Sequence, residues 1–205
     1  MKVLMINGSP RINGNSNELF QEMKEIFEKE NIEVDEYQID KKDIRGCIAC
    51  GYCQSHNQCV FKDDVNDLAN RFEEADGLVI ASPVYYGSAN GTIISLLDRL
   101  FHSTHFEKRF KVGAAFAIAR RAGTTATFDE LNKYFTISQM PIASGRYWNN
   151  GFGREEGQIS ADEEGRQNAR IVARNMVFLM KAIKDAKEKY GLPETEKVNY
   201  THFIK

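Results

Sequence analysis

The sequence predicts an α/β protein built around one doubly wound parallel sheet. Short apolar stretches of strand length alternate along the chain with longer stretches in which apolar residues recur at helical spacing. This alternation is typical of a parallel sheet that carries helices on both faces. The 205 residues are many for one hydrophobic core but few for two, and no Pro/Gly/Ser-rich linker divides them. We therefore expect a single domain over residues 1–205, with strand order 2-1-3-4-5.

The first strand and helix are the clearest elements. Residues 2–6 read Lys-Val-Leu-Met-Ile, and the stretch near 16–30 repeats its apolar residues at helical spacing. Asn15, followed three residues later by Glu18, resembles a helix N-cap with its acidic partner. The chain therefore begins as strand, polar loop and helix.

Four further strands and helices follow. Residues 32–38 alternate apolar and charged side chains, as an edge strand does, whereas residues 77–81 are nearly all apolar, as in a strand buried on both faces. Two more strands are expected at 112–119 and near 137–143. The expected helices lie around 65–72, with Asp63 or Asp64 as N-cap, near 92–101, around 128–135 and near 161–190.

Three polar loops follow the first, third and fourth predicted strands, at 9–16, 82–91 and 120–125. In a parallel sheet of this order, ligands bind beyond the carboxyl ends of the strands, where the strand order reverses. We expect the three loops to meet at one crevice.

The first loop has the composition of a phosphate site. Gly8 and Gly14 let backbone amides approach an anion, side chains of Ser, Asn and Arg can donate to its oxygens, and the next helix points its positive end at the same place. The two glycines are six residues apart and no lysine is present, so neither the dinucleotide fingerprint nor the Walker A loop fits. The alternative is an ordinary polar turn before a capped helix.

The second loop carries two consecutive tyrosines, Tyr85 and Tyr86, after Pro83. Aromatic faces at the mouth of the crevice can lie along a flat conjugated ligand. Their alternative role is ordinary packing at the end of a strand.

Three stretches of the sequence together resemble the flavodoxin-fold NAD(P)H-dependent FMN reductases, and especially the iron-sulfur flavoproteins. They are Gly8-Ser9-Pro10-Arg11 with Gly14-Asn15-Ser16, the Ser82-Pro83-Val84-Tyr85 loop, and the stretch from Gly46-Cys47 to Asp63-Asp64. The resemblance implies a flavodoxin-like fold in which FMN, with NAD(P)H as electron donor, carries the chemistry without a protein acid or base. It places the FMN phosphate at Ser9, Arg11, Asn13, Asn15 and Ser16, the isoalloxazine beside Pro83, Val84, Tyr85, Tyr86 and Gly87, and Gly123 and Thr124 on the far side.

All four cysteines fall in one segment, with the spacing C-x2-C-x2-C-x5-C. This resembles the bacterial ferredoxin run, in which the last gap is three residues and a proline follows. The family resemblance implies a 4Fe-4S cluster in a cysteine-rich insert, residues 44–63, with the ligands Cys47, Cys50, Cys53 and Cys59. A structural zinc ion, a redox disulfide such as Cys47 with Cys50, and cysteines that bind nothing are the alternatives. His102 and His105 are expected on the surface.

The segment 144–205 is predicted to take part in oligomerisation. Its loop 146–153 is aromatic and contains glycine, and the resemblance favours an interface in a homodimer or homotetramer, with Trp148 and Phe152 as anchors beside a neighbour's flavin. The alternative is a surface loop folded onto its own side chains. Because the cysteine segment follows the edge strand, we expect its cluster to serve the flavin of an adjacent subunit.

The function implied is an FMN oxidoreductase of the iron-sulfur flavoprotein type, which passes electrons between NAD(P)H or ferredoxin and a small acceptor. Two alternatives stand beside it. One is an FMN-only NAD(P)H:quinone or azo reductase whose cysteines hold no cluster. The other is a non-catalytic binding module that uses a zinc knuckle.

Charge and hydropathy indicate where the protein acts. Lys and Arg number 27 against 29 Asp and Glu, so no excess of positive charge favours nucleic acid or an anionic membrane as partner. The start shows no signal-peptide pattern, and the longest apolar stretch, near 112–119, is too short to cross a bilayer. We expect a cytoplasmic protein.

Overall fold

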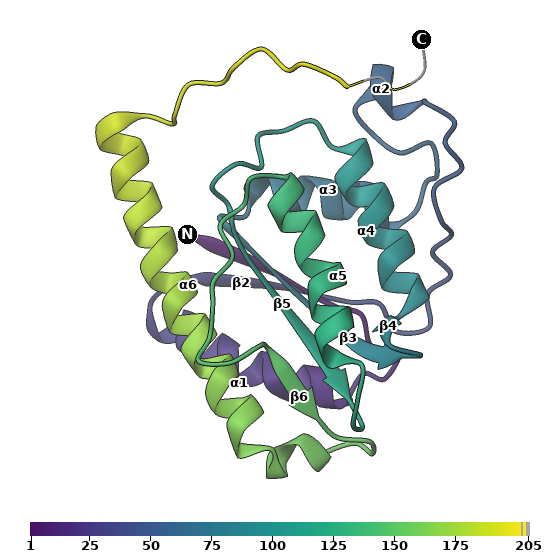
Figure 1. Ribbon diagram of the computed structural model, residues 1–205, viewed down its shortest axis with the longest axis vertical. Coiled ribbons are helices and arrows are strands. Elements are labelled where there is room, and N and C mark those ends of the chain that lie inside the picture. The colour runs from purple at the N-terminus through teal and green to yellow at the C-terminus, as the bar shows by residue number, and fades with distance from the viewer. Residues whose placement is uncertain (202, 204–205) are drawn as a thin grey trace.

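The computed structural model describes residues 1–201 and 203 (Figure 1). Strands and helices alternate along most of the chain, as the sequence predicts. In chain order the elements are β1 (Lys2–Asn7), α1 (Asn15–Lys29), β2 (Glu33–Gln38), α2 (Cys53–His56), α3 (Asp64–Glu74), β3 (Gly77–Tyr85), β4 (Ser88–Ala89), α4 (Gly91–Ser103), β5 (Val112–Ala119), α5 (Thr124–Ile137), β6 (Asn150–Phe152), the 3₁₀ turn η1 (Gln158–Ala161) and α6 (Glu163–Tyr190).

The main sheet has the order β2-β1-β3-β5-β6, and all of these neighbours are parallel. Counted as the five main strands, this is the predicted order 2-1-3-4-5, so the flavodoxin-like fold is confirmed. The short strand β4 pairs with the end of β3 in the antiparallel direction. The sheet order therefore reverses between β1 and β3, and the loops after these two strands lie beside each other.

The fifth strand of the sheet lies elsewhere than predicted. Residues 137–143 form no strand: Ile137 ends α5, and Ile142 makes only an isolated bridge with Gly113. Pro141 has no N–H to donate, which interrupts a ladder at this point. The fifth strand is instead β6, within the segment predicted as a loop at an oligomer interface.

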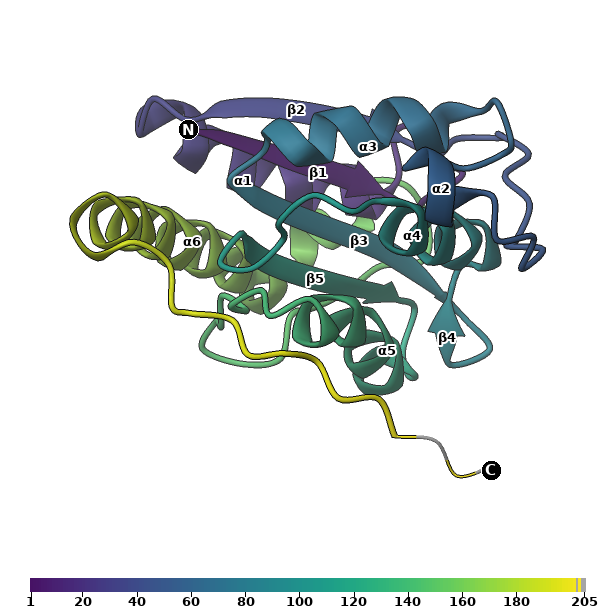
Figure 2. The same cartoon turned by 90° about the horizontal axis from the view of Figure 1, so that it is seen from above.

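Helices cover both faces of the sheet, as Figures 1 and 2 show. On one face α1 and α6 pack over a core that includes Met23, Phe27 and Met176. On the other face α3, α4 and α5 pack over a second core that includes Phe72 and Phe135. Because Met176 on α6 and the strand β6 belong to the segment 144–205, this segment completes the core and the sheet of the fold.

Of the two predicted helix N-caps, one is confirmed and the other is wrong. Asp63 accepts a hydrogen bond from the Val65 amide at 3.3 Å and is the N-cap of α3, as predicted. Asn15 is not the N-cap of α1, because Gly14 holds that position without any side chain. The Asn15 side chain instead accepts a hydrogen bond from the Ile159 amide at 3.2 Å and ties α1 to η1.

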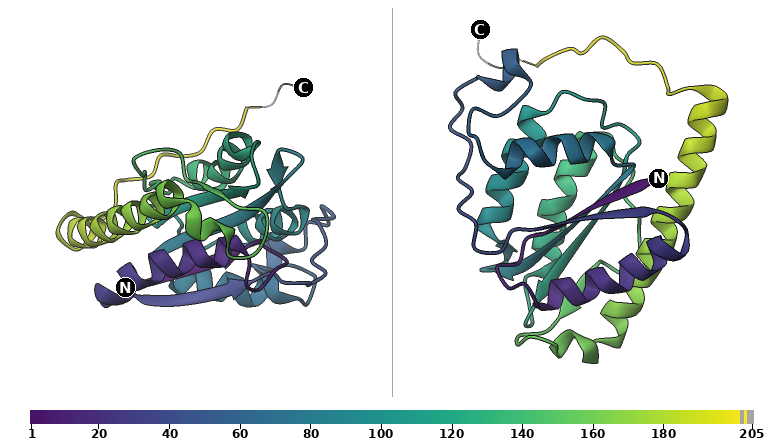
Figure 3. Two further views of the ribbon diagram at one scale, coloured as in Figure 1. Left: turned by 90° about the horizontal axis from the view of Figure 1, so that it is seen from below. Right: turned by 180° about the vertical axis from the view of Figure 1, so that it is seen from behind.

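The two ends of α6 and the chain that follows it lie at the periphery, as Figure 3 shows. After Tyr190 the chain leaves the helix, and residues 191–201 contain no helix or strand. Within residues 1–201 and 203, no helix combines the length and apolar character needed to span a membrane.

Candidate functional site

A crevice opens at the carboxyl ends of β1, β3 and β5, where the switch point of the sheet predicts it. Side chains and backbone from four separate chain segments line it. The lining residues are Ser9, Arg11, Gly14, Asn15, Ser16, Pro83, Val84, Tyr85, Ile118, Ala119, Arg120, Gly153 and Arg154.

Hydrogen bonds join the loop after β1 to the loop after β3. The Gly8 amide donates to the Ala81 carbonyl at 2.7 Å, and the Asn90 side chain donates to the Gly8 carbonyl at 2.9 Å. The Asn90 amide in turn donates to Ser82 Oγ at 2.9 Å. A Cβ on Gly8 would lie 2.9 Å from that of Ile93, so only glycine lets the loop after β1 come this close to α4.

The loop after β1 presents hydrogen-bond donors to the crevice. Since Gly14 caps α1 without a side chain, the amides of the first helical turn have no side-chain acceptor and the positive end of the helix is open to a ligand. The hydroxyls of Ser9 and Ser16 belong to residues only 4% and 2% exposed. Arg11, anchored by a 2.9 Å bond from its guanidinium to the Arg154 carbonyl, adds positive charge. This donor set matches a phosphate group.

A two-residue turn forms the tip of the second loop. Tyr86 and Gly87 both have positive φ, at 52° and 78°, which is the backbone that a tight hairpin between β3 and β4 requires. Glu130 on α5 holds this hairpin, because its carboxylate accepts from Ser88 Oγ and from the Ala89 amide, both at 2.8 Å. The tip is therefore fixed to α5 beside the crevice.

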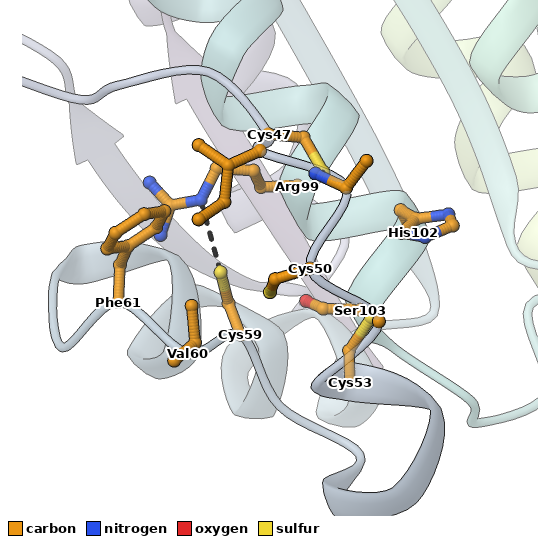
Figure 4. Close-up of a pocket in the computed structure, with 12 residues that line it drawn as sticks. Cys47, Cys50, Cys53, Cys59, Val60, Phe61, Arg99, His102 and Ser103 are labelled. Carbon is orange, nitrogen blue, oxygen red and sulfur yellow. Dashed lines mark hydrogen bonds between the residues drawn. The ribbon is translucent and has the colours of Figure 1, made fainter.

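A second pocket lies at the other end of α4 and contains all four cysteines (Figure 4). Cys47 and Cys50 are exposed, Cys59 is partly buried and Cys53 is buried. Figure 4 shows Cys59 below the Arg99 guanidinium, with Cys50 and Cys53 across the same space. The lining residues are Cys47, Ile48, Ala49, Cys50, Gly51, Cys53, Cys59, Val60, Phe61, Arg99, His102 and Ser103.

The four sulfur atoms do not form a closed ligand set. In the part of the chain that the structure describes, no three Cys, His, Asp or Glu side chains lie close enough together to hold a metal ion. Two of the thiols have local partners instead: Cys47 Sγ accepts from the Ala49 amide at 3.4 Å, and Cys59 Sγ accepts from Arg99 Nε at 3.2 Å.

Arg99 is the charged residue of this pocket, and the sequence analysis did not identify it. The residue is 1% exposed and forms two 2.7 Å hydrogen bonds to the Asp63 carboxylate. Burial alone would lower the pKa of the guanidinium, but the bonds to Asp63 and Cys59 outweigh it and raise that pKa. Arg99 is therefore positively charged beside the cysteines.

The comparison with known proteins decides the family. The model of the family described as NADPH-dependent FMN reductase matches residues 1–155. The chain belongs to this family. It is a flavin-dependent oxidoreductase, and the family implies FMN and NAD(P)H as its cofactors. This membership argues against the alternative of a non-catalytic zinc-knuckle module.

Two curated relatives align with nine-tenths or more of this reductase. An iron-sulfur flavoprotein of Methanocaldococcus jannaschii is 31% identical over 90% of the chain and 100% of the relative. The iron-sulfur flavoprotein of Methanosarcina thermophila is 27% identical over 92% of the chain and 100% of the relative. An FMN-dependent NADPH-azoreductase of Staphylococcus aureus is 29% identical over about half of each chain, 49% and 52%.

Solved structures agree on the fold of the reductase. A flavone reductase superposes with a TM-score of 0.67 at 19% identity, covering 91% of this chain and 65% of that chain. An archaeal flavodoxin superposes with a TM-score of 0.56 at 13% identity, covering 90% and 99%. At these identities the likeness concerns the fold alone.

The structure brings most of the predicted FMN residues of the reductase to one place. Those that line the crevice are Ser9, Arg11, Asn15, Ser16, Pro83, Val84 and Tyr85. Asn13 is exposed on the same loop, and Tyr86 points fully into solvent at the hairpin tip. Gly123 packs on the back of that tip, because a Cβ added to it would lie 2.9 Å from Gly87 Cα.

Thr124 lies in a neighbouring hollow of the reductase. This hollow also contains the exposed aromatic residues before and within β6, Tyr147, Trp148 and Phe152, which are 58%, 52% and 40% exposed. The start of α5 and these aromatic residues therefore share one surface.

Two crevice residues, Gly153 and Arg154, were missed by the sequence analysis. They follow β6, and a Cβ on Gly153 would lie 2.6 Å from the side-chain nitrogen of Asn15. A parallel strand at Asn150–Phe152 would have predicted them, because its carboxyl end lies at the same edge of the sheet as the other loops.

Proposed function

We propose that the protein is an electron-transfer oxidoreductase of the iron-sulfur flavoprotein type. It binds FMN in the crevice and a 4Fe-4S cluster at Cys47, Cys50, Cys53 and Cys59, and it passes electrons between NAD(P)H or ferredoxin and a small acceptor. The observation that carries the proposal is the crevice itself, which joins an anion site at the start of α1 to the aromatic loop after β3.

The residues of the crevice fit FMN. Ser9, Ser16 and the first amides of α1 would hold the phosphate, with Arg11 supplying charge, and Pro83 to Tyr85 would lie along the ring. FMN supplies both hydride acceptance and single-electron release, so the protein itself needs no acid or base. What the chain contributes is binding, orientation and restriction of solvent access.

The donor set of the second pocket fits an iron-sulfur cluster. Four thiols from one short segment line one pocket, and thiolates are the ligands that such clusters require. Two relatives that align over nine-tenths of this chain or more are iron-sulfur flavoproteins. Cys47, Cys50, Cys53 and Cys59 would hold the cluster once the exposed part of the loop closes.

The placement of the two pockets supports transfer between subunits. They have no lining residue in common among those the structure describes, and they lie toward opposite ends of α4. A helix of this length, Gly91–Ser103, measures about 20 Å. We propose a homodimer or homotetramer in which the cluster of one subunit serves the flavin of its neighbour, with the aromatic residues Tyr147, Trp148 and Phe152 in the interface.

One observation favours a second candidate, an FMN-only quinone or azo reductase. The sulfur atoms of Cys47 and Cys59 have local hydrogen-bond partners and do not converge on a metal position within the described residues. In this case the cysteines would bind nothing and electrons would leave the flavin directly.

Anaerobic purification followed by a visible spectrum, with iron and flavin analyses, distinguishes the candidates. Flavin bands together with iron-sulfur absorbance that bleaches on reduction, and that is lost in Cys53→Ser, would support the first. Ser55→Ala, a change on the same short helix, should keep both signals. Flavin bands without iron would favour the second candidate, and a chain that takes up no added FMN would contradict both.

A further inference from the structure

The geometry points to Arg99 as the positioning residue of the cysteine pocket. Arg99 fixes Cys59 as the first ligand of the site and places a permanent positive charge beside the cluster. This inference rests on the proposed function, because it concerns how the same cysteines hold that cluster. It goes further in assigning a role to a residue outside the cysteine motif.

The direction of the Arg99 side chain is determined by its partners. Both terminal nitrogens, Nη1 and Nη2, donate to the Asp63 carboxylate at 2.7 Å, and Nη1 also donates to the Arg45 carbonyl at 3.2 Å. A guanidinium is planar, so two fixed nitrogens determine the direction of the third. The remaining donor, Nε, points to Cys59 Sγ at 3.2 Å.

The backbone of Cys59 is held as firmly as its sulfur. The Cys59 amide donates to Asn66 Oδ1 at 2.9 Å, and Asn66 Nδ2 donates to the Cys59 carbonyl at 3.1 Å. Asn66 and Asp63 both belong to the start of α3, so one helix end positions the cysteine and the arginine together. Cys59 is therefore a preformed ligand position.

The first two cysteines of the segment, Cys47 and Cys50, are held less firmly than Cys59. Cys47 and Cys50 are exposed, and the hydrogen bond that Cys47 Sγ accepts comes from Ala49 within the same loop. The expected order of assembly is thus from the fixed cysteine to the exposed ones.

A buried arginine also changes the electrostatics of the site. Asp63 balances the charge of Arg99, and the cluster with its thiolate ligands would add negative charge on the Nε side of the guanidinium. A hydrogen bond and a positive charge at a cluster sulfur both stabilise the reduced state and raise the reduction potential. Arg99 therefore tunes the cluster as well as positioning it.

The test compares Arg99→Gln and Arg99→Lys with a matched control, Arg71→Gln. Arg71 also forms a two-point pair with an aspartate, Asp35, but this pair joins α3 to β2 and neither residue lines the cysteine pocket. The readout is the midpoint potential of the cluster, followed by optical or paramagnetic resonance titration. We expect a lower potential in Arg99→Gln, a smaller shift in Arg99→Lys, which keeps the charge, and the wild-type potential in Arg71→Gln.

A second readout is independent of the cluster. In the reduced, cluster-free chain, alkylation of each cysteine by iodoacetamide is mapped by mass spectrometry. The rate at Cys59 should change several-fold in either Arg99 variant relative to wild type and Arg71→Gln, because both variants lose the hydrogen bond from Nε to the sulfur. Equal Cys59 rates in all four proteins, or a potential that is the same in wild type and both Arg99 variants, would overturn the inference. A wild-type chain without any cluster would contradict the proposed function, and the alkylation rates would still decide the role of Arg99.

Discussion

Two serine hydroxyls lie at the point where the crevice meets α1. Ser9 accepts a hydrogen bond from the Arg11 amide at 3.1 Å and so shapes the loop, whereas Ser16 lies in the first turn of the helix. Both residues are almost fully buried, yet both line the crevice. At the residue scale, the binding of an anion depends on such hydroxyls.

Replacing Ser16 by alanine should weaken FMN binding. A hydrogen bond to a charged group contributes about 1.5–3 kcal/mol, which corresponds to a rise in the Kd for FMN of roughly ten- to a hundred-fold. Titration of the apoprotein with FMN, followed by flavin fluorescence, measures this. Ser160→Ala, an exposed serine outside the crevice, is the control. An unchanged Kd in Ser16→Ala would show that Ser16 does not bind the phosphate.

Tyr86 adopts a backbone conformation that its side chain does not favour. Its φ of 52° is left-handed, which costs an L-residue about 1–2 kcal/mol, whereas asparagine tolerates it better. Tyr86→Asn should therefore raise the free energy of unfolding of the apoprotein by about 0.5–1 kcal/mol, measured by urea denaturation. Tyr85→Asn, at an extended position in β3, should bring no such gain. A less stable Tyr86→Asn protein would show that the tyrosine ring stabilises the hairpin.

Between elements, the contact of α5 with β5 depends on a glycine. A Cβ on Gly113 would lie 2.6 Å from Cγ of Phe135, well inside van der Waals contact, so the helix could not pack this close to a larger residue. Gly113→Ala should lower the free energy of unfolding by about 1–3 kcal/mol through overpacking. Gly91→Ala, where an added Cβ meets nothing within 4 Å, is the matched control. Equal stability of the two variants would contradict this account.

The contact of α1 with α6 includes a partly buried carboxylate, that of Glu22. Burial alone would raise the pKa of Glu22, but hydrogen bonds from Arg170 and Arg166, at 2.6 and 2.7 Å, outweigh it and hold that pKa below its usual value. The stability that Glu22 contributes is therefore present above about pH 4.3, its value in the unfolded chain, and is lost as the pH falls through the lower folded value.

Glu22→Gln should consequently lower the free energy of unfolding by about 1 kcal/mol at pH 7. The difference from wild type should shrink as the pH is lowered below about 4, as urea denaturation over a pH series would show. Glu25→Gln removes an exposed carboxylate on the same helix, 3.9 Å from Lys29, and should change little at any pH. A Glu22→Gln effect that is constant with pH would contradict the ion-pair explanation.

At the scale of the whole molecule, the exposed aromatic residues before and within β6 are the proposed interface. Trp148 is 52% exposed and its ring lies 4.9 Å from that of Tyr147. Trp148→Glu should shift the protein to smaller species in sedimentation velocity, because a charge is costly in a buried interface. Ile137→Glu, at an exposed apolar position at the end of α5, is the control. Identical sedimentation of wild type and Trp148→Glu would exclude this interface.

Most of the fold follows from periodicity. Residues 112–119 and 77–81 read as buried strands because both faces of a central strand carry apolar residues, and the structure has them in β5 and β3. The fifth strand was mislocated because its three residues, Asn150–Phe152, carry no apolar pattern. They form a strand by pairing with β5, and Gly151 fits between Leu19 and Ile159, which are contacts between distant parts of the chain.

The candidate site also has one part that local sequence motifs predict and another part that they do not. The loop after β1 and the cysteine run are local motifs, and the first of them was assigned to a crevice from its composition and from its place at the end of the first strand. Arg99 and Arg154 carry no local signal, since one occurs in a helix and the other after a strand that was not recognised. Their roles depend on Asp63, Cys59 and Arg11, which are distant from them in sequence.

The sequence by itself determined four of the five main strands, the polar loop after the first of them and the compact group of four thiols, because each is encoded by residues close together in the chain. Only the tertiary structure decided that β6 completes the sheet, that Tyr86 lies at the tip of a hairpin, and that a buried arginine faces Cys59. The physical reason is that burial and hydrogen-bond partners are properties of contacts between distant segments, which a local pattern of residues does not contain.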